Sequence, residues 1–197
     1  SETLVESFGC FGIDKTLALA KGMFAIALWD RKLKVLSLIR DRFGEKPLYY
    51  GFVDDVFVFA SELKAIKVHS SFSPIIDKEA LGLFMEYGYV PAPWSIYENV
   101  KKVLPGVILS LAVNDSDKMM NLIGEKEFWN AREIASASIA LPFDGCFREA
   151  VSLSSDLLRQ SVGNQLLSDV PVGSLLSGGI DSTLITALMQ DVSGTAV

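Results

Sequence analysis

Ser177-Gly178-Gly179-Ile180-Asp181-Ser182 is the segment from which the C-terminal part of this chain is best interpreted. It follows an apolar run, residues 171–176, that predicts a β-strand, and it precedes apolar residues at helical spacing in residues 184–189. A strand, a small-residue turn and a helix start together build an anion site. Glycines let backbone N–H groups approach an oxyanion, and the helix N-terminus adds a partial positive charge.

The residues around the two glycines narrow the class of anion. No lysine follows them, so the loop is not the G-x-x-x-x-G-K-[ST] loop that grips a transferring γ-phosphate. Ser177, Ser182 and Thr183 supply hydroxyl donors, and Asp181 is placed to hold Mg²⁺. The loop therefore suits a phosphate or pyrophosphate. The same spacing also fits an ordinary strand-to-helix turn with an Asp near the helix N-cap, and the two interpretations stay open on spacing alone.

Composition sets the class of protein. The chain has 197 residues, half of them apolar, with a net charge of −6 that is spread over interspersed acids and bases. This indicates a globular protein of one or two domains and argues against a nucleic-acid partner, which a basic stripe would mark. The longest strongly apolar run, residues 23–29, is far shorter than the roughly 20 residues that span a bilayer, so no membrane partner is expected.

Cysteine and histidine usage excludes two further kinds of site. Cys10 and Cys146 lie far apart and form no disulfide framework, which favours a reducing compartment, the cytoplasm. We expect Cys10 to pack within a helix and Cys146 to lie at a helix entry. His69 is the single histidine, which excludes histidine-rich metal sites, and its neighbouring serines predict a surface loop.

The first part of the chain predicts an α+β fold. Residues 1–20 fit one or two short helices broken at Gly9 and Gly12, and Ser61 is the expected N-cap of a later short helix. Residues 23–29 are apolar almost throughout, which predicts a central strand covered on both faces. Expected strands, beginning as an antiparallel meander, are residues 23–29, 35–39, 47–53, 56–60, 102–111 (bent at Pro105-Gly106) and 119–123, and expected helices are residues 61–68 and 77–87.

The second part predicts an α/β fold. A stripe with a period near 3.6 residues after Asp144 indicates a long amphipathic helix, which leads to the expected strand and anion loop. Residues 128–143 are rich in Ala and Ser without a firm period and are the expected linker. The predicted domains are therefore residues 1–127 and 144–197, and a further strand is expected to begin at Thr195.

Several separated segments, in this order, resemble the glutamine-dependent (B-type) asparagine synthetase family over nearly the whole chain. They include Gly22-Met23-Phe24-Ala25-Ile26-Ala27-Leu28-Trp29-Asp30, Arg40-Asp41-Arg42-Phe43-Gly44-Glu45-Lys46-Pro47-Leu48-Tyr49-Tyr50, Phe59-Ala60-Ser61-Glu62-Leu63-Lys64-Ala65, Gly88-Tyr89-Val90-Pro91, Lys102-Val103-Leu104-Pro105-Gly106 and Ser168-Asp169-Val170-Pro171-Val172-Gly173 with the anion loop.

The resemblance implies two domains. The first is a class II glutaminase of the N-terminal-nucleophile hydrolase type, an α-β-β-α sandwich. The second is an ATP-pyrophosphatase (adenine nucleotide α-hydrolase-like) domain built on a parallel sheet. The implied reaction consumes aspartate, ATP and glutamine, passes through β-aspartyl-AMP, and uses ammonia released from glutamine. ATP and Mg²⁺ are the implied cofactors, the small-molecule substrates are the implied partners, and a homodimer is left open.

The resemblance also assigns residues. The nucleotide would contact Leu176, Ser177, Gly178, Gly179, Ile180, Asp181 and Ser182, with Mg²⁺ on Asp181. Met23 matches a position that lines the ammonia passage in relatives, although an apolar core role fits it equally. Arg40, Asp41, Arg42 and Lys46 are not glutamine ligands by this comparison. They predict a charged, ion-paired turn near the domain interface.

The chain departs from the family pattern in one respect that concerns catalysis. The family's glutaminase nucleophile is an N-terminal cysteine whose α-amino group is the base, and neither Cys10 nor Cys146 matches it. No catalytic residue of that site is identified, and we expect a piece of a longer protein that alone has neither glutaminase nor synthetase activity. A related amidotransferase with another acceptor (β-lactam synthetase-like or polysaccharide-modifying) and a non-catalytic interaction module are the alternatives.

Overall fold

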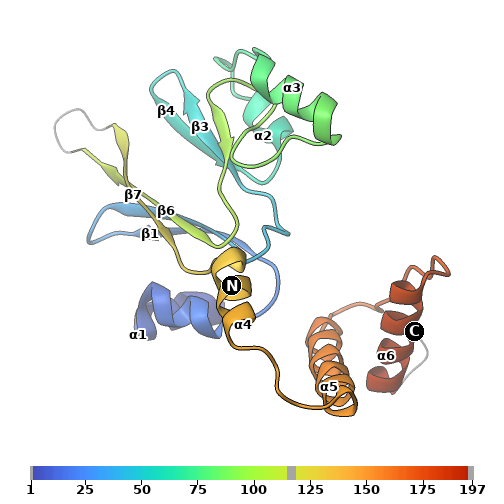
Figure 1. Cartoon of the computed structure of the whole chain (residues 1–197). Coiled ribbons are helices and arrows are strands. Elements are labelled where there is room, and N and C mark those ends of the chain that lie inside the picture. The colour runs from blue at the N-terminus through green and yellow to red at the C-terminus, as the bar shows by residue number, and fades with distance from the viewer. Residues whose placement is uncertain (1, 115–118, 195–197) are drawn as a thin grey trace. The chain divides into compact units, whose positions relative to one another are not determined.

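The computed structural model describes residues 2–114 and 119–194, which form two compact units, residues 1–135 and residues 136–197. Figure 1 shows the elements of both units. The first unit contains α1 (Glu2–Leu19), β1 (Ala25–Asp30), β2 (Val35–Arg40), β3 (Tyr49–Val53), β4 (Val56–Ala60), α2 (Leu63–Lys67), α3 (Lys78–Tyr87), β5 (Val100–Lys102), β6 (Val107–Val113) and β7 (Met120–Glu127). Then come α4 (Ala131–Ala140), α5 (Phe147–Gln165) and α6 (Ile180–Ser193).

The strands of the first unit form two antiparallel sheets instead of one meander. One sheet has the order β1-β2-β6-β7 and the other the order β4-β3-β5. The expected strand over residues 102–111 is divided by the turn at Pro105-Gly106, so that β5 joins the second sheet and β6 the first. The segments on either side of this turn thereby link the two sheets.

The strand expected at the centre of a sheet lies at an edge. β1 pairs only with β2 among the described strands, and the side chain of Trp29 is 43% exposed. The central strands are β2 and β6, in which Leu38, Ile39 and Leu109 are almost fully buried. A continuous apolar run therefore did not distinguish this edge strand from a central one.

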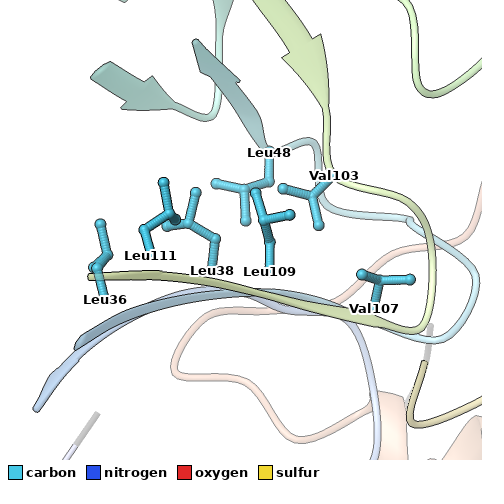
Figure 2. Packing of buried hydrophobic residues seen from close by; sticks show 7 residues of the cluster. All are labelled: Leu36, Leu38, Leu48, Val103, Val107, Leu109 and Leu111. Carbon is cyan, nitrogen blue, oxygen red and sulfur yellow. The ribbon is translucent and has the colours of Figure 1, made fainter. Parts of the chain in front are cut away.

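The core of the first unit lies between the two sheets. Alternate residues of β2 and β6 point from one sheet toward Leu48 and Val103 below the other sheet (Figure 2). Tyr50 and Phe57, from β3 and β4, pack against this cluster from the second sheet. The buried members of the cluster are Leu36, Leu38, Leu48, Val103, Val107, Leu109 and Leu111.

Helices cover the outer faces of both sheets. Leu17 of α1 packs on Ile39 and Ile108, which point to the face of the first sheet opposite the core between the sheets. Ile66 of α2 packs on Val53 and Val100 of the second sheet. The packing order within this unit is therefore helix, sheet, sheet, helix.

Two helix predictions needed correction. α1 is kinked at Gly12, where φ is 75° and ψ is 175°, but it runs through Gly9 without a break, and Cys10 is exposed instead of packed. α2 begins at Leu63, and its N-cap is Glu62, one residue after the expected cap Ser61; Glu62 makes no side-chain capping bond. In α3, by contrast, the Asp77 carboxylate caps the first turn.

The described part of the second unit is helical. α5 and α6 lie side by side (Figure 1) and bury Val162, Leu188 and Met189 between them. Much of the apolar stripe of α5 is exposed, including Phe147 at 85%. The expected linker, residues 128–143, contains the helix α4.

The strand expected over residues 171–176 does not form, and residues 166–179 connect α5 to α6 without regular structure. A strand needs neighbouring strands to pair with its N–H and C=O groups, and residues 136–194 offer none. The strand expected to begin at Thr195 lies outside the described residues. No helix in the described part of the chain is long and apolar enough to cross a membrane.

Candidate anion site

The Gly178-Gly179 turn leads directly into α6 and is open to solvent. Gly178 has a φ of 84°, a left-handed conformation that favours glycine, and a Cβ placed there would meet no atom within 4 Å. Gly179 is the N-cap of α6 and has no side-chain capping bond. The nearest atoms to a Cβ on Gly179 are the hydroxyl oxygens of Ser177 and Ser182, at 3.7 and 3.9 Å. The turn is therefore not packed beneath another element and leaves room for an anion.

Hydroxyl groups surround this turn. Ser177 Oγ and Ser182 Oγ are 2.9 Å apart, and Ser182 also donates to the carbonyl of Gly179 at 3.1 Å. Thr183 Oγ1 donates to the same carbonyl at 2.7 Å. The two serine hydroxyls therefore converge on the open side of the turn. The Thr183 hydroxyl points back to the Gly179 carbonyl, so it stabilises the turn more than it serves as a donor to an anion.

The start of α6 supplies backbone donors. The first N–H groups of any helix have no carbonyl partner within the helix, and at this end they carry the positive pole of the helix dipole. Ile180 and Asp181, in the first turn, are both exposed, so these donors are within reach of solvent. Leu176, just before the turn, is 60% exposed. The predicted site residues 176–182 are thus contiguous and accessible.

A second contact fixes the loop to the helix. Ser174 Oγ lies 2.7 Å from Thr186 Oγ1, and Thr186 also donates to the carbonyl of Ser182 at 2.8 Å. The segment before the glycines is therefore tied to the second turn of α6. In this way side-chain bonds hold the turn in place although no strand precedes it.

The metal prediction rests on a single carboxylate. In the described residues no group of three or more His, Cys, Asp or Glu side chains is arranged to hold a metal ion, and Asp181 is the carboxylate in the first turn of α6. Mg²⁺ bound with a nucleotide needs only one or two protein carboxylates, because substrate phosphates and waters supply its other ligands. Asp181 at an open anion turn fits this kind of site, and it does not fit a metal held by protein ligands alone.

Backbone hydrogen bonds hold the charged turn 40–46, and within the described residues none of its side chains forms an ion pair. Asp41 is 1% exposed, and its carboxylate accepts four backbone N–H groups. The donors are Phe24 at 3.2 Å, Phe43 at 3.2 Å, Glu45 at 2.9 Å and Lys46 at 2.9 Å. A buried charge with so many donors organises the chain around it. The expectation that ion pairs hold this turn is therefore wrong, while its place near a domain interface remains a prediction.

The two neighbouring arginines act in the same way. Arg40 donates to the carbonyls of Gly44 at 2.6 Å, Lys46 at 3.0 Å and Val103 at 2.8 Å. Burial lowers the pKa of Arg40, and the charge of Asp41 opposes that shift. The guanidinium lies so close to the turn that a Cβ on Gly44 would come within 2.9 Å of Arg40 Cζ.

Arg42 caps the C-terminal end of α1. Its guanidinium donates to the carbonyls of Ala20 at 2.7 Å, Leu17 at 3.0 Å and Ala18 at 3.4 Å. A cation at this end also complements the negative pole of the helix dipole. Through these hydrogen bonds, Arg40-Asp41-Arg42 connects both sheets and α1. The charged residues in the sequence do not by themselves reveal this role.

The other predicted residues are dispersed. Met23 precedes β1 and is 57% exposed, so the core interpretation is wrong, while its place on an ammonia passage remains a prediction. It borders an apolar groove of about 640 Å³ between α1 and β1. Cys146 is the N-cap of α5, as expected for a helix entry. His69 lies in a turn after α2, and its Nδ1 accepts the N–H of Ser71.

Two family models match this chain, one in each part. The family model described as glutamine amidotransferase domain matches residues 1–129, and the one described as asparagine synthase matches residues 154–197. The first match covers the sheets and their helices, and the second covers most of α5, the anion turn and α6.

Individual relatives agree with this assignment. The chain is 37% identical over 171 residues to asparagine synthetase (glutamine-hydrolyzing) 1 of Bacillus subtilis, which covers 87% of the chain and 25% of that protein. It is 30% identical over 193 residues to putative asparagine synthetase (glutamine-hydrolyzing) 2 of Methanocaldococcus jannaschii, covering 97% of the chain and 35% of that protein. The chain therefore spans between a quarter and about a third of the length of these curated relatives.

Proposed function

The chain belongs to the glutamine amidotransferase domain family, and we propose that it is part of a glutamine-hydrolysing asparagine synthetase. Such an enzyme forms asparagine, AMP, pyrophosphate and glutamate from aspartate, ATP, glutamine and water. The proposal is supported by the order of the two family matches along one chain and by relatives that carry this name. The glutamine-hydrolysing chemistry is assigned to the whole enzyme and to none of the residues described above.

The open Gly178-Gly179 turn at the start of α6 is the observation that supports a role of this chain in the ATP reaction. The hydroxyl groups of Ser177 and Ser182 flank this turn in the sequence and meet beside it. Attack of the aspartate carboxylate on the α-phosphorus of ATP expels pyrophosphate, so negative charge grows on the leaving phosphates. Backbone N–H groups of residues 178–182 and the hydroxyls of Ser177 and Ser182 are donors fixed where that charge grows. Donors that are already oriented stabilise the charge without reorganisation during the reaction.

Asp181 is the residue that would hold Mg²⁺, which neutralises phosphate charge when it is bound. Its place in the first turn of α6 sets a carboxylate beside the hydroxyls that face the phosphates. A carboxylate in the first turn of a helix also interacts favourably with the positive pole of the helix dipole. Leu176 offers an apolar side chain next to the turn, suited to contact with the nucleoside part of ATP.

The finer domain structure follows from the same proposal. Residues 1–127 would belong to the amidotransferase domain, residues 128–143 to the connection, and residues 144–197 to the synthetase domain. The helix-sheet-sheet-helix packing of the first unit supports an α-β-β-α sandwich of the N-terminal-nucleophile hydrolase type. In the second domain, residues 171–176 would become a strand of a parallel sheet once neighbouring strands are present. Two free cysteines accord with a location in the cytoplasm.

Calorimetric titration of this chain with pyrophosphate, with and without Mg²⁺, tests the role of the turn. We expect Mg²⁺-dependent binding that weakens about tenfold or more in Asp181→Asn, because the carboxylate that holds the metal is lost. Asp156→Asn, an exposed carboxylate on α5, is the matched control and should bind like the unaltered chain. Equal affinity of the unaltered chain and Asp181→Asn would refute the assignment of Asp181.

A further inference from the structure

Trp129 marks the point at which the chain leaves the first sheet, and it is held from two sides. The N–H groups of Phe128 and Trp129 both donate to the carbonyl of Gly106, at 2.9 and 3.3 Å. The rings of Trp129 and Phe43 meet edge to face, with their centroids 4.8 Å apart and an interplanar angle of 60°. Phe43 remains 70% exposed, and its one aromatic contact among the described residues is with Trp129.

Both residues that hold Trp129 are themselves held by Asp41. The N–H of Phe43 donates to Asp41 Oδ1 at 3.2 Å, and the N–H of Gly106 donates to the carbonyl of Asp41 at 2.9 Å. Gly106 has a φ of 69°, and a Cβ there would come within 2.1 Å of the carbonyl oxygen of Trp129. A buried residue on one segment thus fixes, in two steps, a residue nearly ninety positions later in the sequence.

Hydrogen bonds also fix the chain directly after Trp129, at the start of α4. Asn130 Oδ1 accepts the N–H groups of Arg132 at 2.9 Å and Glu133 at 3.2 Å, which caps the first turn. Asn130 Nδ2 donates to Glu127 Oε2 at 2.9 Å, so the cap is also tied to the end of β7. α4 itself has no buried residue, and packing therefore contributes little to holding its first turn.

We propose that the turn 41–46 anchors Trp129 and thereby keeps the start of α4 ordered, with Phe43 as the positioning residue. In this arrangement the fold of the first unit determines where the chain departs toward residues 136–197. The order of the connection then depends on the first unit and not on α4's own helical tendency, which is weak for ten exposed residues. The inference does not depend on the proposed chemistry, since it concerns only contacts within residues 1–135.

Limited trypsin digestion under native conditions tests this anchor. Arg132 lies in the first turn of α4, so cleavage after it requires that turn to open, and the rate reports the open population. Cleavage after Lys101, in β5, reports opening of the sheets instead. The rate at each site is followed by mass spectrometry for the unaltered chain, Phe43→Ala, Phe43→Tyr and Phe84→Ala, a partly exposed phenylalanine on α3 that serves as the control.

For Phe43→Ala we expect cleavage after Arg132 to rise about two- to tenfold, the value of one aromatic pair, while cleavage after Lys101 stays unchanged. Phe43→Tyr keeps the ring and should restore the original rate, and Phe84→Ala should have no effect at Arg132. An unchanged rate at Arg132 in Phe43→Ala would overturn the proposal. So would an equal rise at Lys101, which indicates general destabilisation, or a failure of tyrosine to restore the rate.

Discussion

Ser177 and Ser182 flank the Gly178-Gly179 turn in the sequence, and their hydroxyl oxygens lie 2.9 Å apart at the start of α6. This pairing brings two donors to one side of an open loop, where the N-terminal N–H groups of the helix also lie. Without a ligand the two hydroxyls are bonded to each other, and Ser182 also donates to the carbonyl of Gly179. An oxyanion that contacts both oxygens would accept from both hydroxyls once their hydrogens rotate toward it and the bond from Ser182 to Gly179 is released.

Removal of one hydroxyl should weaken anion binding. We expect Ser177→Ala to lower the affinity for magnesium pyrophosphate about tenfold, the usual size of a hydrogen bond to a charged group. Ser154→Ala, at an exposed serine of α5 that makes no contact with the turn's hydroxyls, is the matched control and should bind like the unaltered chain. Calorimetry measures both. The assignment fails if Ser154→Ala weakens binding as much as Ser177→Ala does.

Asp41→Asn should destabilise the first unit. The carboxylate accepts four backbone N–H groups, and an amide would place its own NH₂ donor against two of them. We expect a loss of about 2–3 kcal/mol in the free energy of unfolding, measured by denaturant titration. Asp30→Asn is the control: its carboxylate also accepts two backbone N–H groups, but in an exposed turn, and less than about 1 kcal/mol is expected. Equal losses of unfolding free energy in the two variants would show that the burial of Asp41 contributes nothing to stability.

Leu38→Ala probes the core between the sheets. Leu38 is fully buried there (Figure 2), so truncation leaves a cavity and should cost about 3 kcal/mol of unfolding free energy. Leu33→Ala, at a position that is 72% exposed, should cost less than about 0.5 kcal/mol. Thermal or denaturant unfolding of both variants gives the comparison. A small effect at Leu38 would mean that the two sheets do not pack as described.

The N-terminal end of α5 should loosen in acid. Hydrogen bonds from the backbone N–H of Cys146, at 2.7 Å, and from its side chain lower the pKa of Glu149 below the ordinary value of 4.5. Because the folded pKa is lowered, the contribution of Glu149 is complete above the ordinary value and is lost as the pH falls through the folded pKa. The protection of the first-turn amides of α5, that is, their exchange rate compared with that of an unstructured peptide at the same pH, should therefore fall below about pH 4.5.

Glu149→Gln separates this effect from general acid unfolding. Glutamine has no charge to lose, so its first turn should exchange faster than that of the unaltered chain at pH 6 and should not change specifically in the acid range. An acid-dependent loss of protection of the same size in both chains would assign the effect to another group.

Local patterns predicted the elements that depend on neighbours in the sequence. The helix after Asp77 follows from its capping side chain and apolar spacing, and the helix after Gly179 follows from the glycine turn and the period of the residues beyond it. The strands of the two hairpins in residues 25–60 follow from turns between β-rich runs. In each case the determining residues lie within a few positions of the element.

Features set by distant residues were not predictable in this way. Whether β1 is central depends on which strands pair with it, and its own apolar run carries no such information. Residues 171–176 form no strand, because strand formation requires partners that residues 136–194 do not supply. The charges of Arg40 and Asp41 suggested ion pairs, but their partners are backbone groups such as the carbonyl of Val103, far along the chain.

The most direct test of the central claim is an amide ¹H–¹⁵N NMR titration of this chain with magnesium pyrophosphate. If the turn is an anion site, the largest shifts will fall on the amides of residues 178–182, because those N–H groups receive the phosphate oxygens. The amides of residues 43–46, which already donate to the buried Asp41 or to its carbonyl, should not respond. Absence of shifts in residues 178–182, or shifts of equal size at residues 43–46, would contradict the account.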